Sequence, residues 1–153
     1  MCVLFNQLIP LIPGMENTKT YSFQRIMAIE DSQIDQYVIE QMMKRSNFAE
    51  QATICGSAKD ALDKLGELND NKDALPQIIF LDIHMPNMNG FAFLSELEKK
   101  YGHIKDLMSV IILTTSLDPI DRTTSNSYSN IKMYLNKPLT IDKLQYVKSQ
   151  LGA

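Results

Sequence analysis

The sequence has no excess of positive charge and only two cysteines. There are 15 Lys and Arg against 18 Asp and Glu, which gives a net charge of −3, and no basic block stands out. This composition does not favour nucleic acid or an anionic membrane as a partner. Cys2 and Cys55 form neither a disulfide framework nor a metal-ligand pattern, so we expect both to be reduced thiols in a cytoplasmic protein.

The sequence also lacks a segment with the features of a signal peptide or a membrane anchor. Residues 1–14 are apolar, but they have no basic start and no small-residue cleavage site, and two prolines interrupt them. They are also too short to span a bilayer. We therefore expect this segment to be a dispensable tail, as an upstream start codon would produce, rather than an anchor.

Five short apolar runs are present instead, each closed by turn residues and followed by a helical pattern. They cover residues 25–29, 51–55, 78–81, 110–113 and 131–135. Ser32, Ser57 and Thr140 stand where they would cap the helices after the first, second and fifth runs. The regular alternation of strands and helices predicts an α/β fold of one domain, with a parallel five-stranded sheet and five helices on its two faces.

The sequence predicts the buried face of one helix and the low stability of another. In the helix after Ser32, apolar residues at helical spacing predict a buried stripe made of Ile34, Tyr37, Val38 and Met42. The helix from Asp118 is built largely from poor helix formers, so it is expected to be the least stable helix of the domain. It is either a segment that switches conformation or a loosely held surface helix.

Polar side chains stand at the ends of four of the five strands. Glu30 and Asp31 follow the first strand, Asp82 the third, Thr114 the fourth and Lys137 the fifth. The carboxyl ends of parallel strands meet at one edge of a sheet, where ligand sites usually lie. Taken alone, Asp82 could equally cap its loop. The convergence of all five residues favours a common site.

The charges of these residues favour a metal-assisted phosphoryl transfer. Three clustered carboxylates repel one another unless a cation lies among them. Mg²⁺ prefers oxygen ligands, and a carboxylate beside it can attack a phosphoryl group to give an aspartyl phosphate. In this hypothesis Glu30 and Asp31 hold the metal, and Asp82 is the nucleophile. Thr114 and Lys137 bind the phosphoryl oxygens.

Four motifs together point to a known family. They are the acidic pair Glu30-Asp31, the segment FLDIHMPNMNG from Phe80, the segment LTTS from Leu113, and Lys137-Pro138. With these motifs the sequence resembles the receiver domain of two-component response regulators, of the single-domain kind that includes the chemotaxis regulator. The resemblance implies a doubly wound, flavodoxin-like sheet of strand order 2-1-3-4-5. It assigns residues 23–152 to the receiver domain and leaves residues 1–22 as an N-terminal tail.

The resemblance assigns roles to the acidic residues. It implies that Asp82 is the phosphoacceptor and also contacts the metal. Asp31 would ligate Mg²⁺ directly, and Glu30 would act through a water molecule. The backbone carbonyl of His84 would complete the protein ligands.

The same resemblance implies a conformational switch. Thr114 would hydrogen-bond the phosphoryl group and Lys137 would pair with it, with a cis peptide bond between Lys137 and Pro138. Tyr134 falls on the position of the family's switch aromatic, which turns inward as the Thr114 hydroxyl moves toward the phosphate. The face that then changes is made by the fourth helix, the fifth strand and the fifth helix.

The implied function is a signalling module rather than an enzyme with a separate substrate. It would accept phosphate from a histidine kinase or a histidine phosphotransfer protein, and catalyse only its own phosphotransfer and dephosphorylation. The sequence after Lys137 accommodates one helix, so we expect docking on a protein target and no DNA-binding output domain. A phosphorylation-dependent homodimer stays open.

Two other classes of function are less favoured. Enzymes of the haloacid dehalogenase type also form an aspartyl phosphate, but they usually have a second Asp two residues after the nucleophile. This sequence has His84 there and no cap domain. A degenerate receiver that acts only as a binding surface would have lost an acid, the Thr or the Lys, and all of these are present.

Overall fold

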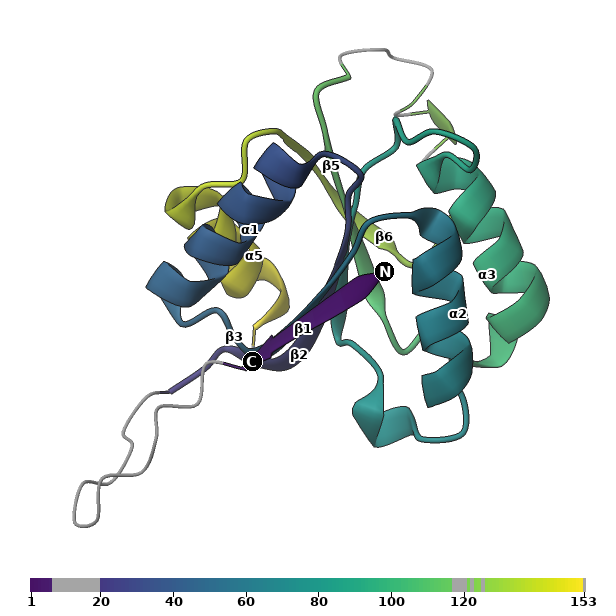
Figure 1. The fold of residues 1–153 in the computed structure, drawn as a ribbon, viewed down its shortest axis with the longest axis horizontal. Helices are drawn as coiled ribbons and strands as arrows, with labels where there is room; N and C mark the ends of the chain where they lie inside the picture. Colours follow the sequence, from purple (N-terminus) through teal and green to yellow (C-terminus); the bar gives the residue numbers. More distant parts are fainter. Residues whose placement is uncertain (7–19, 117–120, 122, 125, 153) are drawn as a thin grey trace.

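The computed structural model of the protein describes residues 1–6, 20–116, 121, 123–124 and 126–152. In this part of the chain six strands form one sheet, in the order β1-β3-β2-β4-β5-β6. Helices α1 and α5 cover one face of the sheet, and α2 and α3 cover the other (Figure 1). The strands are β1 (Cys2–Asn6), β2 (Phe23–Ile29), β3 (Ala49–Cys55), β4 (Ile78–Leu81), β5 (Ser109–Thr114) and β6 (Ile131–Asn136). The helices are α1 (Gln33–Ser46), α2 (Ala58–Leu68), α3 (Gly90–Lys105) and α5 (Ile141–Leu151), with a 3-10 turn η1 (Lys72–Ala74) after α2.

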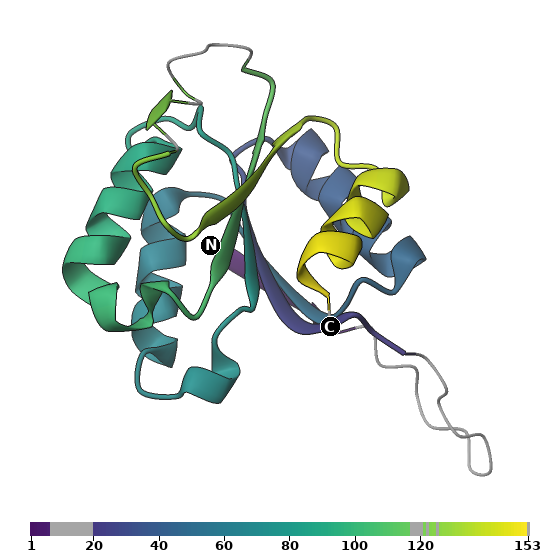
Figure 2. The same ribbon diagram turned by 180° about the vertical axis from the view of Figure 1, so that it is seen from behind.

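Strands β2 to β6 form the predicted doubly wound sheet. They pair in parallel, and their order is 2-1-3-4-5 when β2 is counted as the first strand. The predicted fold is therefore confirmed, with β1 as an additional strand. The carboxyl ends of the parallel strands lie together at the top of the molecule in Figure 1 and, seen from behind, in Figure 2. This edge of the sheet is where the predicted site residues stand.

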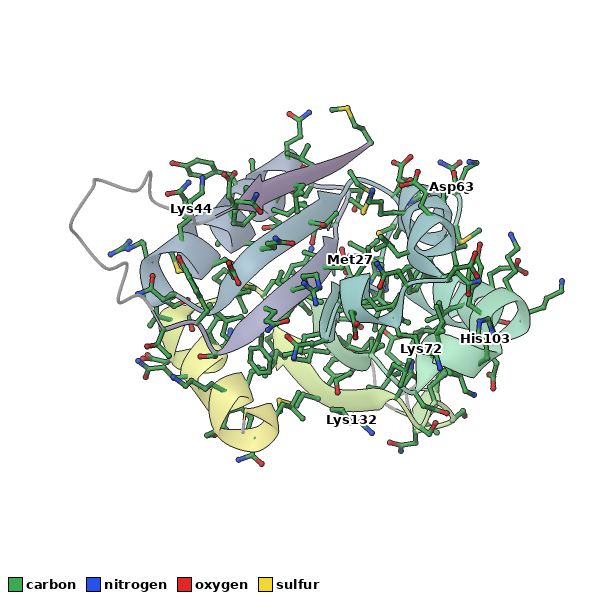
Figure 3. All side chains as sticks on the ribbon, turned by 90° about the horizontal axis from the view of Figure 1, so that it is seen from below. Met27, Lys44, Asp63, Lys72, His103 and Lys132 are labelled. Carbon is green, nitrogen blue, oxygen red and sulfur yellow. A yellow bond between two sulfur atoms is a disulfide. The ribbon has the colours of Figure 1, made fainter. Side chains whose placement is uncertain are left out.

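The central strands are apolar on both faces because helices cover both. Ile26 packs in the cluster between the sheet and the helices α1 and α5, whereas Met27 and Leu81 pack on the side of α2 and α3. Figure 3 shows Met27 in the middle of the molecule, between Lys44 of α1 and Asp63 of α2. A slip of one residue in any central strand would exchange its two faces, so this packing fixes where each strand ends.

Side-chain caps fix the start of the four described α-helices. Ser32, Ser57, Asn89 and Thr140 each accept a hydrogen bond from the backbone N–H three residues further on. The caps predicted at Ser32, Ser57 and Thr140 are therefore confirmed. Each cap lies at the end of the loop that follows a strand, so it also restrains the loops at the carboxyl edge of the sheet.

The buried stripe predicted for α1 is wrong at Ile34 and Tyr37, whereas Val38 and Met42 are half-buried and Met42 packs against the core. Ile34 and Tyr37 are 77% and 63% exposed, whereas Ile39 and Met43 are buried. The helix has apolar residues on adjoining faces, and helical spacing alone does not show which of these faces meets the sheet. Contacts with β3 and α5 select the face that carries Ile39 and Met43.

Two further points concern helices. Of the helix predicted from Asp118, residues 118–120, 122 and 125 lie outside the described residues, residues 121, 123 and 124 are helical, and turns follow at residues 126–127 and 129–130. Among the helices that are described, none is both long enough and apolar enough to cross a bilayer.

The start of the chain forms an edge strand that was not predicted. Cys2–Asn6 pairs with β3 in antiparallel orientation, and Cys2 lies opposite Cys55, with 4.0 Å between the two Cα atoms. The two cysteines form a disulfide, so the prediction of two reduced thiols is wrong. It failed because residues 1–14 were assigned no strand, which left Cys55 without a neighbour. Cys55 ends a core strand as predicted, and the domain boundary at residue 23 stays a prediction.

The disulfide predicts a measurable loss of stability on substitution. Cys2→Ser should lower the free energy of unfolding under oxidising conditions by roughly 4 kcal/mol, because the bond restricts an unfolded loop of some 53 residues. Urea unfolding followed by circular dichroism measures this difference. In the presence of a reductant the two proteins should unfold alike, and equal midpoints under oxidising conditions would contradict the pairing.

Candidate functional site

Three acids meet at the carboxyl edge of the sheet. Glu30 and Asp31 follow β2, and Asp82 follows the neighbouring strand β4. One oxygen of each acid lies within 4.8 Å of the others, a spacing at which one metal ion could be shared. Glu30 and Asp82 are buried, whereas Asp31 is exposed. We call these three residues the metal-site acids.

The ammonium group of Lys137 lies among these acids. Its Nζ is 2.5 Å from Glu30 Oε2 and 2.9 Å from Asp82 Oδ2. A third carboxylate, that of Asp35 in α1, has its Oδ2 3.0 Å from the same nitrogen. The Lys137 side chain is only 8% exposed, so the ion pairs are shielded from water.

The backbone around Lys137 fixes the direction from which its side chain enters. The Lys137 N–H donates to the carbonyl of Thr114 at 2.9 Å, which continues the pairing of β6 with β5 past the strand end. The peptide bond between Lys137 and Pro138 is cis, as predicted. Lys143 Nζ donates to the carbonyls of Asn136 and Pro138, at 2.5 and 2.8 Å, and thereby holds the turn into α5.

Burial and ion pairing act against each other in this cluster. Burial raises the pKa of Glu30 above its ordinary value, although hydrogen bonds from Lys137 and from the Ser32 N–H oppose the rise. Burial tends to lower the pKa of Lys137, but hydrogen bonds to Asp82, Glu30 and Asp35 outweigh it, and the pKa lies above its ordinary value. The ion pairs therefore favour the charged form of Lys137, and a second cation would further favour the ionised form of Glu30.

The donor set fits a hard divalent cation. The metal-site acids present carboxylate oxygens, and Mg²⁺ commonly takes one or two carboxylates together with water and phosphate oxygens. Lys137 supplies one positive charge for three acids, so negative charge remains to attract a metal. The predicted metal ligands are therefore compatible with this geometry. The backbone carbonyl of His84 as a further ligand stays a prediction.

Thr114 and His84 form the polar wall beside the phosphoacceptor candidate. Thr114 is fully buried at the end of β5, and its Oγ1 lies 3.4 Å from His84 Nδ1. The same Oγ1 accepts a hydrogen bond from the Ser116 N–H at 3.1 Å. The backbone N–H of His84 donates to Asp82 Oδ1 at 3.1 Å. Asp82 is thus held at one oxygen by a backbone N–H and at the other by Lys137.

Tyr134, the predicted switch residue, lies on β6. It is the register partner of Ile112 in β5, and its half-buried ring packs against the core on the side of α2 and α3. Thr114 stands two residues after Ile112 on β5, so the two predicted switch residues belong to neighbouring strands. The movement that couples them stays a prediction.

Gly90 allows α3 to begin directly against the backbone of Asp82. A Cβ atom at this position would lie 2.6 Å from the Asp82 carbonyl oxygen and 2.9 Å from Ile83 Cα. The Gly90 N–H donates to the Ile83 carbonyl at 2.9 Å, which keeps the loop closed. The loop over residues 82–90 therefore depends on a residue without a side chain here.

Residues 26–147 match the response regulator receiver domain. The chain belongs to this family. The family resemblance inferred from the four motifs is therefore confirmed, and the acidic cluster lies inside the matched region.

Individual relatives agree with this assignment. The receiver is 32% identical over 140 residues to the sensor histidine kinase CheAY of Helicobacter pylori, which covers 90% of this chain. Among solved structures it is similar to a two-component response regulator from Cytophaga hutchinsonii, with 26% identity, a TM-score of 0.77, and coverage of 84% of this chain and 96% of that one. A response regulator from Legionella pneumophila is 31% identical, with a TM-score of 0.69 and coverage of 84% and 97%.

The receiver spans a small part of some of these relatives. It covers 16% of the Helicobacter pylori kinase, and 35% of a protein-glutamate methylesterase/protein-glutamine glutaminase from Trichodesmium erythraeum to which it is 25% identical. Such similarity establishes the domain and not the activity of the whole relative.

Sequence reasoning missed Asp35 as a member of the site. The predicted site contains Glu30, Asp31, Asp82, Thr114 and Lys137 but not Asp35, whose backbone N–H donates to the Ser32 cap of α1. One feature of the sequence could have indicated Asp35. It follows Glu30-Asp31 by about one helical turn and belongs to α1, the helix that begins at the acidic edge of the sheet. That position places its carboxylate beside Lys137.

Gly90→Ala should destabilise the receiver and disturb Asp82. The new methyl group would meet backbone atoms, which cannot move aside as the end of a side chain can, so we expect a loss of about 1–3 kcal/mol. Chemical denaturation gives this value. Gly102→Ala in the same helix is the matched control, because a Cβ there has no neighbour within 4 Å and should be neutral or slightly stabilising. Equal stability of the two variants would contradict the close approach at Gly90.

Proposed function

We propose that this receiver accepts a phosphoryl group on Asp82, with Mg²⁺ bound by the metal-site acids, and changes the face formed around β6 and α5 so that a partner protein binds. The observation that carries the proposal is the position of Lys137 Nζ, 2.9 Å from Asp82 Oδ2 and 2.5 Å from Glu30 Oε2. This ammonium group lies where it can leave the carboxylate and neutralise a phosphoryl oxygen attached to it. An ion pair between Lys137 and Asp82 that served only to stabilise the fold would not require Glu30 and Asp31 at the same edge.

Each residue of the site has a part in the transfer. A carboxylate oxygen of Asp82 forms a bond to phosphorus while the bond from phosphorus to the donor nitrogen breaks, and that nitrogen keeps the electron pair. Lys137 and the Thr114 hydroxyl bind the equatorial oxygens, which hold the developing charge. Bound Mg²⁺ would supply further neutralisation of those oxygens. The backbone N–H of His84, 3.1 Å from Asp82 Oδ1, keeps the carboxylate oriented.

The phosphoryl donor and the target follow from this chemistry. A histidine kinase or a histidine phosphotransfer protein carries phosphorus on nitrogen, which suits a carboxylate acceptor. The Helicobacter pylori relative is by name a sensor histidine kinase, which supports a donor of this class. On the output side, Thr114 would turn toward the phosphoryl group, and Tyr134 would move inward on the adjacent strand. A target protein would then bind the altered face.

Loss of the acceptor carboxylate tests the assignment of the site. Asp82→Asn should abolish covalent labelling by acetyl phosphate in the presence of Mg²⁺, because an amide oxygen is too weak a nucleophile. Intact-mass spectrometry reports the added phosphoryl group. Asp63→Asn, at an exposed acid on α2, is the matched control and should be labelled like the wild type. Full labelling of Asp82→Asn would show that phosphate goes elsewhere.

Replacement of Lys137 should separate phosphorylation from switching. Lys137→Ala should still be labelled, about a hundredfold more slowly because one preorganised charge is lost, and its β6 should not respond to phosphorylation. Hydrogen exchange over Ile131–Asn136, with and without acetyl phosphate, measures that response. Lys137→Arg, which keeps the charge, is the replacement if the alanine variant is unstable. Lys59→Ala on α2 is the control at an exposed lysine. A wild-type response of β6 in Lys137→Ala would rule out this route to the switch.

A further inference from the structure

Lys137 has a third carboxylate partner that the proposed function does not use. Asp35 Oδ2 lies 3.0 Å from Lys137 Nζ, comparable with the 2.9 Å to Asp82 Oδ2. Asp35 belongs to the first turn of α1, and its side chain is 32% exposed, against 2% for Glu30 and 7% for Asp82. The Asp35 carboxylate is therefore in contact with water, whereas the carboxylates of Glu30 and Asp82 are shielded from it.

The position of Asp35 is set independently of the candidate metal site. Its backbone N–H donates to Ser32 Oγ, the cap of α1, at 3.3 Å, and a carboxylate in the first turn is stabilised by the helix dipole. Among the described residues, the acids grouped closely enough to share one ion are the metal-site acids, without Asp35. Asp35 is therefore not one of the residues that would hold the metal ion.

We propose that Asp35 is a positioning residue that holds Lys137 and competes for it with the phosphoryl group on Asp82. This inference rests on the proposed function. In the resting state three carboxylates share the ammonium group. After phosphoryl transfer the phosphoryl oxygens need the same group, while Asp35 still attracts it from α1.

The negative charge of Asp35 disfavours a phosphoryl group on Asp82, as its contact with Lys137 also does. A unit negative charge a few ångströms from a phosphoryl dianion raises the free energy of the phosphorylated state. Asp35 therefore weakens the binding of a phosphoryl group in two ways, by holding the lysine and by direct repulsion. The consequence is a receiver whose phosphorylated fraction is kept low unless the donor supplies phosphate continuously.

Equilibrium binding of beryllofluoride, a phosphoryl mimic, tests this proposal on the full chain at saturating Mg²⁺. Asp35→Asn should bind beryllofluoride about fivefold more tightly than the wild type, the size expected for removing one charge near a partly exposed site. Asp35→Glu should return the affinity toward the wild-type value because it keeps the charge. Glu40→Gln removes an acid from the same helix that pairs with Lys44, and it should leave the affinity unchanged. Fluorine NMR or calorimetry gives the dissociation constants.

The outcomes separate this proposal from the proposed function. If Asp35 had a purely structural role in α1, Asp35→Asn would bind beryllofluoride as the wild type does or more weakly. Either result overturns the proposed competition for Lys137. If the wild type binds beryllofluoride and Asp82→Asn does not, that failure concerns Asp35 alone. Absence of binding by the wild type, or binding that persists in Asp82→Asn, overturns the proposed function and this inference together.

Discussion

The ammonium group of Lys137 among three carboxylates is the interaction on which the site depends. Glu30 and Asp82 are buried, and buried carboxylates are strongly disfavoured unless a cation pairs with them. Their partner comes from the end of β6, two strands away from β4 in the sheet. The two acids therefore have their buried cationic partner only when the whole parallel sheet is formed in the correct order and register.

The polar site lies at the carboxyl edge of the sheet and not on one of its faces. Apolar residues fill both faces of the central strands, so polar groups are concentrated where the strands end. The same edge holds more negative than positive charge, since the metal-site acids and Asp35 face a single lysine. An acidic excess of this kind costs stability in the resting protein, and it leaves a place for a divalent cation and for a group that recruits the lysine.

Much of this arrangement could be predicted from the sequence, because each strand end is marked by a change from apolar to polar residues. The boundaries of β4 were predicted residue for residue, and Glu30 after β2 and Asp82 after β4 do contact Lys137. Asp35 was missed because an acid three residues after a capping serine already has a sufficient local explanation at the start of a helix. Its contact with Lys137 depends on the tertiary approach of α1 to the end of β6.

The remaining differences also come from long-range packing. The face of α1 that is buried depends on its contacts with β3 and α5, which helical spacing does not contain. Strand β1 and its disulfide join residues 53 positions apart in the chain, and a short apolar segment at a chain end gives no local sign of its partner. Local pattern determines the elements here, and the tertiary contacts decide which of their faces are used.

A crystal structure of the receiver with Mg²⁺ and beryllofluoride is the most direct test of the central role of Lys137. The account predicts beryllium bonded to an Asp82 oxygen, with Lys137 Nζ and Thr114 Oγ1 within hydrogen-bond distance of its fluorides. A structure in which beryllofluoride occupies Asp82 while Lys137 keeps its contacts with the carboxylates alone would contradict the account.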